Sequence, residues 1–291
     1  MVLLSRLAAS VLTIVVLVYA AGCGGQTQAR FERTDELRSP ATPAPSLEVR
    51  TTNGSVRVEQ VLGDEIVVVA HFRMQTQERL DAVSAIVHRE DDHVSINVQW
   101  PDDKRHGSES CSFIVQLPEA RKVTLVSSNG ALHVENLGHD LDLTTSNGRI
   151  TASGFSGNVK ARSSNGAITL TGFDGNATAR TSNGRIEIVE AGGSVSATSS
   201  NGSVNLSLTD ASAGPVSATT SNGSITLEFG PALAGSLAAS TSNGSISVFG
   251  LEQTGDITTK ARNLSVNLGE SANAEPSKLS TSNGKITIRK R

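Results

Sequence analysis

The sequence predicts an all-β fold: a parallel β-solenoid (β-helix-like) of about ten coils, 18–21 residues each, with a strand-rich N-terminal cap. Two observations predict it. The triplet Ser-Asn-Gly recurs at nearly constant spacing, and apolar residues alternate with polar ones on both sides of each triplet. Such a repeat is typical of stacked units that bury a common core. The repeating residues therefore describe the architecture, and any recognition must depend on the variable residues between them.

The triplet places one asparagine in each unit. From Asn129 the spacings are 18, 18, 18, 18, 21, 21, 20 and 20, counting a degenerate copy at Asn263, and Thr52-Asn53-Gly54 is a further copy near the start. The asparagines expected to form one structural ladder are Asn53, Asn129, Asn147, Asn165, Asn183, Asn201, Asn222, Asn243, Asn263 and Asn283.

Each triplet lies between two predicted strands. Apolar residues stand six and four positions before the asparagine, as at Val123 and Leu125, and three and five positions after it, as at Leu132. Polar residues separate them, so each strand has one buried face. Threonine two positions before the asparagine shares the buried parity and is expected to point inward. Phe155 and Phe173, eight positions after it, are expected to close the opposite edge of the coil.

An antiparallel meander of hairpins fits the same local pattern, because Asn-Gly is a strong hairpin signal. Three observations favour the solenoid. No aspartate replaces the asparagine, as expected if stacked amides hydrogen-bond about 4.8 Å apart, where carboxylates would repel. Asn263 is followed by Leu264, which suggests that the asparagine matters more than the glycine. Units lengthen only around residues 210–214 and 231–235, at one edge. The asparagines are therefore expected to form an inward-facing ladder at one corner.

Residues 61–120 interrupt the repeat. Ile66–Ala70, Val94–Val98 and Phe113–Leu117 are predicted strands, separated by polar stretches. We expect this insert to cap the first coils, since an open solenoid end exposes unpaired strand edges. Cys111 precedes the last of these apolar runs and is expected to be an inert strand residue; an intermolecular disulfide is the alternative.

The N-terminus predicts export. Residues 1–22 have the proportions of a signal peptide. The run Ala20-Ala21-Gly22-Cys23 resembles a bacterial lipobox, which implies lipidation of Cys23; an ordinary cleaved signal with an incidental cysteine is the alternative. Gly24 is not an inner-membrane retention residue, so outer-membrane attachment is favoured, on the periplasmic or the surface side. Residues 23–46 are predicted to be a disordered tether, because their charges and prolines cannot bury a face. The solenoid domain is expected over residues 47–291.

Composition excludes some functions. The net charge is −3, which argues against a nucleic-acid partner, and aromatic residues are 3%, too few for a base-stacking surface. Scattered acidic residues and histidines, such as His139-Asp140 and the pair Glu187 and Glu190, show no catalytic spacing. His88, Asp92 and His93 could bind a metal ion, but their ligand spacing does not recur elsewhere in the sequence. We expect no catalytic residues, no metal and no cofactor.

One exposed surface is a candidate for binding. Arg149, Lys160, Arg162, Arg180 and Arg185 fall on neighbouring predicted coils beside the triplet. Arranged as a basic ladder, they would suit an anionic glycan or lipopolysaccharide phosphate. The alternative is that these cations only solvate the sheet.

The run Phe113–Pro118, the following Val123-Thr124-Leu125 and the segment Leu47–Val56, with the Ser-Asn-Gly series, resemble the bacterial "putative adhesin" domain family. The resemblance covers about residues 45–291. It implies an exported or membrane-tethered β-solenoid, and the family offers no catalytic residues to carry over.

The sequence thus predicts a non-enzymatic, lipid-anchored cell-envelope protein with an adhesin-like binding or scaffold role. Its expected partners are the membrane, through the N-terminal lipid, and an envelope glycan or protein. A periplasmic envelope-stress or regulatory component is the alternative, and a polysaccharide-acting enzyme is a second one.

Overall fold

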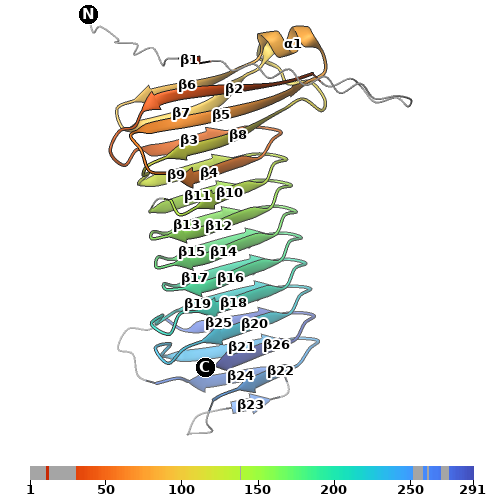
Figure 1. Cartoon of the computed structure of the whole chain (residues 1–291). Helices are drawn as coiled ribbons and strands as arrows, with labels where there is room; N and C mark the ends of the chain where they lie inside the picture. The colour runs from red at the N-terminus through yellow and green to blue at the C-terminus, as the bar shows by residue number, and fades with distance from the viewer. Residues whose placement is uncertain (1–10, 13–30, 138, 252–257, 261, 270–274) are drawn as a thin grey trace, which may run out of the picture.

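The computed structural model describes residues 11–12, 31–137, 139–251, 258–260, 262–269 and 275–291. Nearly all of the regular secondary structure that it describes is β-strand, arranged as two long sheets that face each other along an elongated stack (Figure 1). A cap closes the end of the stack that carries the one α-helix found in the described ranges. No helix in the described part of the chain has both the length and the apolar character needed to cross a membrane.

Each sheet has 13 strands, and we call them sheet A and sheet B. In spatial order sheet A contains β1 (Val11–Leu12), β2 (Phe31–Pro40), β5 (Glu65–Met74), β8 (Ser110–Leu117), β4 (Val56–Gln60), β10 (Leu132–Glu135), β12 (Ile150–Phe155), β14 (Ile168–Phe173), β16 (Ile186–Ala191), β18 (Val204–Leu208), β20 (Ile225–Phe229), β26 (Ile286–Lys290) and β22 (Ile246–Phe249). Sheet B contains β23 (Thr258–Lys260), β24 (Asn263–Asn267), β21 (Ser236–Thr241), β25 (Ser277–Thr281), β19 (Val216–Thr220), β17 (Val195–Ser199), β15 (Ala177–Thr181), β13 (Val159–Arg162), β11 (Asp140–Thr144), β9 (Lys122–Val126), β3 (Ser46–Arg50), β7 (His93–Gln99) and β6 (Ser84–Glu90).

One regular coil is a strand of sheet B, an Asn-Gly turn and a strand of sheet A. Equivalent strands of successive coils pair in parallel and in register, so Leu141 lies opposite Val159 in sheet B and Ile150 opposite Ile168 in sheet A. The β-solenoid prediction is confirmed. The hairpin alternative is wrong, because the strands on either side of each turn belong to different sheets.

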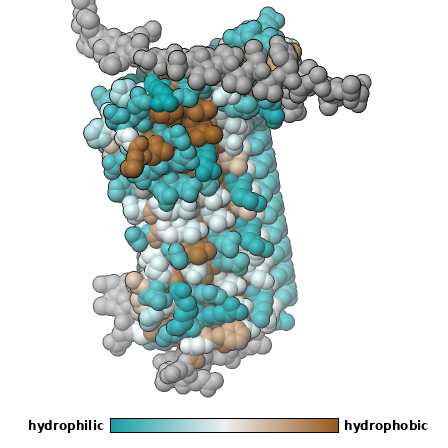
Figure 2. Space-filling view, in the orientation of Figure 1, coloured by the Kyte–Doolittle hydropathy of each residue, from teal (hydrophilic) through white to brown (hydrophobic). Residues whose placement is uncertain are grey.

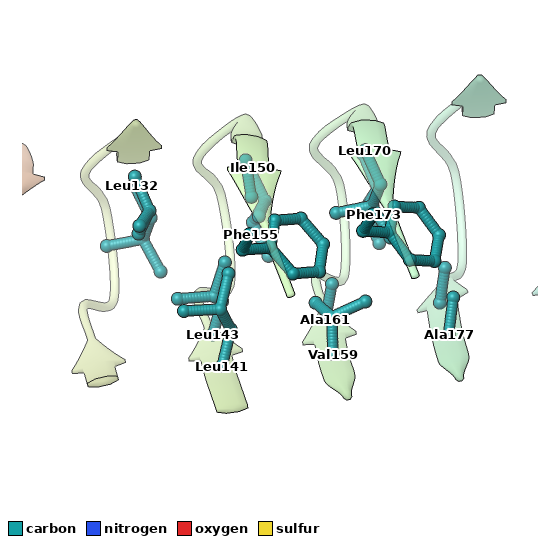
Figure 3. Close-up of a cluster of buried hydrophobic side chains, with 14 of the residues drawn as sticks. Leu132, Leu141, Leu143, Ile150, Phe155, Val159, Ala161, Leu170, Phe173 and Ala177 are labelled. Atoms are coloured by element: carbon teal, nitrogen blue, oxygen red, sulfur yellow. The ribbon is translucent and has the colours of Figure 1, made fainter. Parts of the chain in front are cut away.

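The core lies between the inner faces of the two sheets. Figure 3 shows Ile150 and Leu170 of sheet A facing Val159 and Ala161 of sheet B, and all four are fully buried. A buried Ile or Leu contributes about 1.5–3 kcal/mol, and alanine much less. The small alanine side chains on the inner face of sheet B therefore keep the two sheets close. Each coil depends on its neighbours for its stability.

Phe155 and Phe173 close the edge opposite the Asn-Gly turns, as predicted. Both are buried, and their rings stack with centroids 4.9 Å apart and planes 6° apart (Figure 3). Parallel register places identical residues one above the other, which produces this stacked pair.

The order of coils in the stack differs from their order in the chain at both ends. The coil of β3 and β4 lies between the cap strands β7 and β8 and the next coil, β9 and β10. At the other end the last coil, β25 and β26, is inserted between β19/β20 and β21/β22 (Figure 1). At each end of the stack, the spatial order of the coils therefore differs from their order along the chain.

Residues 61–120 supply β5 to β8, helix α1 (Gln77–Ala82) and a 3-10 turn η1 (Pro101–Asp103). They lie at the end of the stack, where the sequence placed a cap. The helix was not predicted. It begins at Thr76, whose hydroxyl accepts a hydrogen bond from the Arg79 amide (3.3 Å), and it buries only Leu80.

The predicted disordered tether is wrong for residues 31–46. Strand β2 pairs antiparallel with β5 along its whole length. Its Leu37 faces the core, while Arg33 donates to the carbonyl oxygens of Leu80 (2.5 Å) and Val83 (2.6 Å) at the end of α1. Its charged residues give β2 the composition of a linker, but here the strand pairs with β5 and Arg33 joins it to the helix of the cap.

Candidate binding surfaces

The asparagine ladder runs along one edge of the stack. The side-chain Nδ2 of each asparagine donates to the Oδ1 of the asparagine one step nearer the cap, at 2.5–2.9 Å. The asparagines joined in this way are Asn53, Asn129, Asn147, Asn165, Asn183, Asn201, Asn222, Asn283 and Asn243, in stack order. Aligned amide dipoles in such a chain strengthen one another.

Two expectations about this ladder are wrong. The asparagine side chains at the regular coils are exposed, not inward-facing. The strand alternation ends at the buried residue two positions earlier, such as Thr145, and the tight turn then directs Asn147 outward. Asn263 is not in the ladder. It opens β24, which pairs antiparallel with β21 outside the regular coil pattern, so its neighbour Leu264 is not a substitute for a turn glycine.

The buried Ser or Thr two positions before each asparagine joins successive turns. The Thr181 hydroxyl donates to the Gly166 carbonyl of the preceding coil (3.0 Å) and accepts from the amide of Gly184 in its own turn (3.2 Å). The same bond to the preceding glycine carbonyl recurs along the stack at 2.8–3.1 Å. These hydroxyls satisfy buried backbone groups that the turn would otherwise leave unpaired.

The turn glycine is required by close packing. A Cβ at Gly166 would lie 1.7 Å from the carbonyl oxygen of Gly148, and the equivalent glycines have the same clash. The interpretation that asparagine matters more than glycine is therefore wrong, because no larger residue fits beneath the preceding turn.

The ladder ends on the cap at a buried ion pair. Asn53 Nδ2 donates to the Glu109 carbonyl oxygen (3.2 Å). The Glu109 side chain is fully buried and pairs with Arg79 in two bonds, Nε–Oε1 at 2.6 Å and Nη2–Oε2 at 2.9 Å. Burial alone would raise the pKa of Glu109, but the bonds from Arg79 and from the His106 amide (2.9 Å) outweigh it and lower that pKa.

A second ladder on the opposite edge was not predicted. Asp140 Oδ1 accepts from the Asn158 amide (2.9 Å), Asn158 Oδ1 from the Asn176 amide (3.0 Å), and Asn176 Oδ1 from the Ser194 amide (3.0 Å). The signal was present in the sequence as Gly-Asn, Gly-Asn and Gly-Ser pairs 18 residues apart. Asp140, weighed above as a catalytic candidate, therefore holds the first rung of a structural ladder.

The five basic residues form two groups instead of one ladder. Lys160, Arg162 and Arg180 lie on the outer face of sheet B, where Arg162 and Arg180 are register neighbours on β13 and β15. Arg149 and Arg185 lie across the asparagine ladder, at the starts of β12 and β16 and two coils apart. All five are exposed.

The outer face of sheet B carries excess positive charge at this place. Among the described residues, the only carboxylate paired with Lys160, Arg162 or Arg180 is Asp142, 3.8 Å from Arg162. An exposed pair at this separation contributes little and leaves the guanidinium accessible. On the neighbouring strands, Lys160 lies opposite Asp142 and Thr178. Arg162 and Arg180 lie beside Thr144 and Thr198, so no large side chain covers the two guanidinium groups.

The remaining candidates do not assemble into a catalytic or metal site. No group of three potential metal ligands occurs among the residues that the structure describes. Asp92 pairs with Arg121, and His93 lies 3.6 Å from Glu48. Cys111 is a buried residue of β8, and burial raises the pKa of its thiol well above the ordinary value. Cys23 lies outside the described residues.

The exposed surface is mostly polar along the regular coils. Figure 2 shows apolar residues on this face gathered mainly toward the cap end. Within the described ranges, the exposed large apolar side chains are Leu62, Ile86, Ile114 and Phe249, of which only the last lies outside the cap region.

Comparison with known proteins agrees with this architecture. The model of a family described as Toastrack DUF4097 matches residues 44–289. A solved structure of a putative adhesin from Bacteroides fragilis NCTC 9343 superposes with a TM-score of 0.52 at 13% identity, covering 89% of this chain and 97% of that one. A putative lipid binding protein from Parabacteroides distasonis ATCC 8503 has a TM-score of 0.38 at 11% identity, covering 89% and 96%. At these identities the first likeness shows a shared fold alone. No curated protein matches the chain.

Proposed function

Since the chain belongs to the Toastrack DUF4097 family, we propose that it is a non-enzymatic β-solenoid of the bacterial envelope, with an adhesin-like role, anchored by a lipid on Cys23. The known relatives of this fold include a putative adhesin. A rigid stack of repeated coils suits display of a surface, because equivalent side chains recur about 4.8 Å apart along it.

The observation that carries the binding role is the cluster of Lys160, Arg162 and Arg180 on the outer face of sheet B, which we call the basic surface. Two guanidinium groups on neighbouring strands and an ammonium group beside them match closely spaced anionic groups. Guanidinium groups bind carboxylate and phosphate in bidentate geometry. The ligand class is therefore an anionic envelope polymer, such as an acidic glycan or the phosphates of lipopolysaccharide.

The binding test uses two double charge reversals with the same change in net charge. Arg162→Glu with Arg180→Glu alters the basic surface; Arg149→Glu with Arg185→Glu alters the cations on the other side of the asparagine ladder. The probes are immobilised lipopolysaccharide and polygalacturonate, in about 0.15 M salt. We expect at least about a tenfold loss of binding from the first variant and under about threefold from the second. Equal losses from both variants would mean that only net charge acts, and would contradict the basic surface.

The anchor has its own test. A lipid on Cys23 would join the membrane to Phe31, the first residue of β2, through a chain of eight residues. Such a chain spans about 28 Å at most, so the cap end would lie near the membrane and the regular coils would project from it. We expect the Cys23→Ser variant to leave the membrane fraction. Its retention there would contradict the anchor, and protection of the wild-type protein from protease added to intact cells would contradict surface display.

A further inference from the structure

A cleft of about 390 Å³ opens on the edge opposite the asparagine ladder. It lies where the loops that enter and leave the cap meet the first regular coils. Its lining comes from four loops and comprises Gln60, Glu119, Ala120, Asn136, Leu137, His139, Gly154, Phe155 and Ser156. Its size falls within the range of small-molecule sites in proteins.

The apolar part of the lining is rigid. Ala120, Leu137 and Phe155 are 0%, 1% and 5% exposed, so they belong to the core and present only a small apolar area to the cleft. The stacked contact of Phe155 with Phe173 holds its ring in place (Figure 3). A site on packed residues does not have to be ordered when a ligand binds, which lowers the entropic cost of binding.

The polar part of the lining combines donors and acceptors. His139 Nδ1 lies 3.0 Å from the Ser156 hydroxyl, which orients the imidazole. Gln60 Nε2 donates to the Pro118 carbonyl oxygen (2.6 Å), which orients its amide. Among the described residues, the exposed Glu119 carboxylate has neither an ion-pair nor a side-chain hydrogen-bond partner.

The side-chain amide of Asn136 lies beside the cleft, held there by the local backbone conformation. Asn136 has a positive φ of 51° and its amide donates to the Ser153 carbonyl oxygen (2.9 Å). Its side chain occupies the space above Gly154, where a Cβ would lie only 2.3 Å from Asn136 Oδ1. Gly154 itself has a φ of 66°, so this position favours glycine for its conformation and for the space it leaves.

From this geometry we propose that the cleft binds one or two rings of an uncharged saccharide. Carboxylate, amide, imidazole and hydroxyl groups can pair with the vicinal hydroxyls of a sugar, and the small apolar floor can contact its C–H face. The only permanent charge in the lining is negative, which disfavours the anionic polymers assigned to the basic surface. The proposal goes beyond that function, because the two sites lie on different parts of the coil.

The test follows the ring of His139 by NMR while uncharged disaccharides (cellobiose, maltose and N,N′-diacetylchitobiose) are added, with galacturonate as the charged probe. We expect at least one uncharged sugar to shift the His139 signal saturably, with a Kd on the order of 1 mM, and galacturonate to shift it less. Absence of any saturable shift up to about 10 mM, or a stronger response to galacturonate, would overturn the proposal.

A matched pair of variants locates the binding. Ser156→Trp fills the cleft, whereas Asp174→Trp places the same side chain at the equivalent loop position of the next coil, outside it. We expect Ser156→Trp to weaken sugar binding at least about tenfold and Asp174→Trp less than about twofold. Glu119→Gln, which keeps the shape, should also weaken binding, because an amide is a poorer acceptor than a carboxylate. Unchanged binding in Ser156→Trp would overturn the proposal. The basic-surface double variant should bind these sugars normally, so the two proposals can fail separately.

Discussion

At the residue scale, the Ser-Asn-Gly turn divides its tasks among three side chains. The asparagine links exposed amides from coil to coil, the buried hydroxyl before it joins successive backbones, and the glycine lets one turn lie against the next. The sequence showed that all three recur, but their relative importance followed from the geometry. Only the close approach between Gly166 and Gly148 reveals that the glycine is the most constrained of the three.

A glycine substitution tests this order. In Gly166→Ala the new Cβ would meet a backbone carbonyl that cannot move without shifting the preceding turn. We therefore expect the free energy of unfolding to fall by about 3 kcal/mol or more. Asn165→Ala in the same turn should lose about 1 kcal/mol, since its hydrogen bonds are exposed to water. Urea unfolding of both variants measures the difference. A larger loss in Asn165→Ala would show instead that the asparagine contributes more to stability than the glycine does.

At the scale of elements, the cap is held by charged side chains that join its strands to its helix. The ion pair of Glu109 with Arg79 connects β8 to α1, and Arg33 connects β2 to the other end of the helix. Arg33 also lies over the Phe72 ring, 5.1 Å from its centroid. None of these contacts has a periodic signature, which is why the sequence predicted a cap here but neither its helix nor β2.

The Glu109 pair predicts a pH dependence. Because its folded-state pKa is lowered, the carboxylate stabilises the fold fully above its unfolded pKa of about 4.3, and this contribution is lost as the pH falls through the folded pKa. Glu109→Gln leaves Arg79 only the exposed Asp102, 3.8 Å away, as a counter-charge. The change should lower the free energy of unfolding by about 3–5 kcal/mol at pH 7, with a smaller further loss in acid.

Urea midpoints at pH 7 and pH 3 check this. The control is Glu36→Gln, whose partner Arg38 (2.7 Å) is half exposed, so that change should barely alter the free energy of unfolding. If stability falls as much between pH 7 and pH 3 in Glu109→Gln as in the wild type, the pair is not the source of the pH dependence.

At the scale of the whole molecule, stability is shared between neighbouring coils, because each coil touches only the coil before it and the coil after it in the stack. The inserted position of β25 and β26 makes the last residues of the chain essential neighbours of β21 and β22. A defect in this final segment should therefore affect a coil that precedes it in sequence.

A chain that ends at residue 274 tests this arrangement. Without β25 and β26, we expect backbone amides of residues 236–249 to exchange rapidly with solvent, whereas those of residues 122–208 keep their protection. Hydrogen exchange with the full chain as control measures both segments. Retained protection of residues 236–249 would show instead that this coil can stack directly on β19 and β20.

The sequence by itself determined the coil, its register and its buried columns, because stacking in parallel forces every unit to repeat the same alternation and the same turn. The tertiary structure alone decided which way the asparagines point, that Asn263 lies outside the ladder, and that residues 31–40 form a strand. It also separated Arg162 and Arg180 from Arg149 and Arg185, and it formed the cleft beside Phe155. The outward direction of the asparagines depends on the geometry of the turn, where the strand alternation has already ended. The other features depend on the threading of the two ends and on contacts between loops of different coils, which do not repeat along the chain. The Ser-Asn-Gly period thus predicted the interior of the stack, while its edges and ends, where ligands are proposed to bind, required the folded molecule.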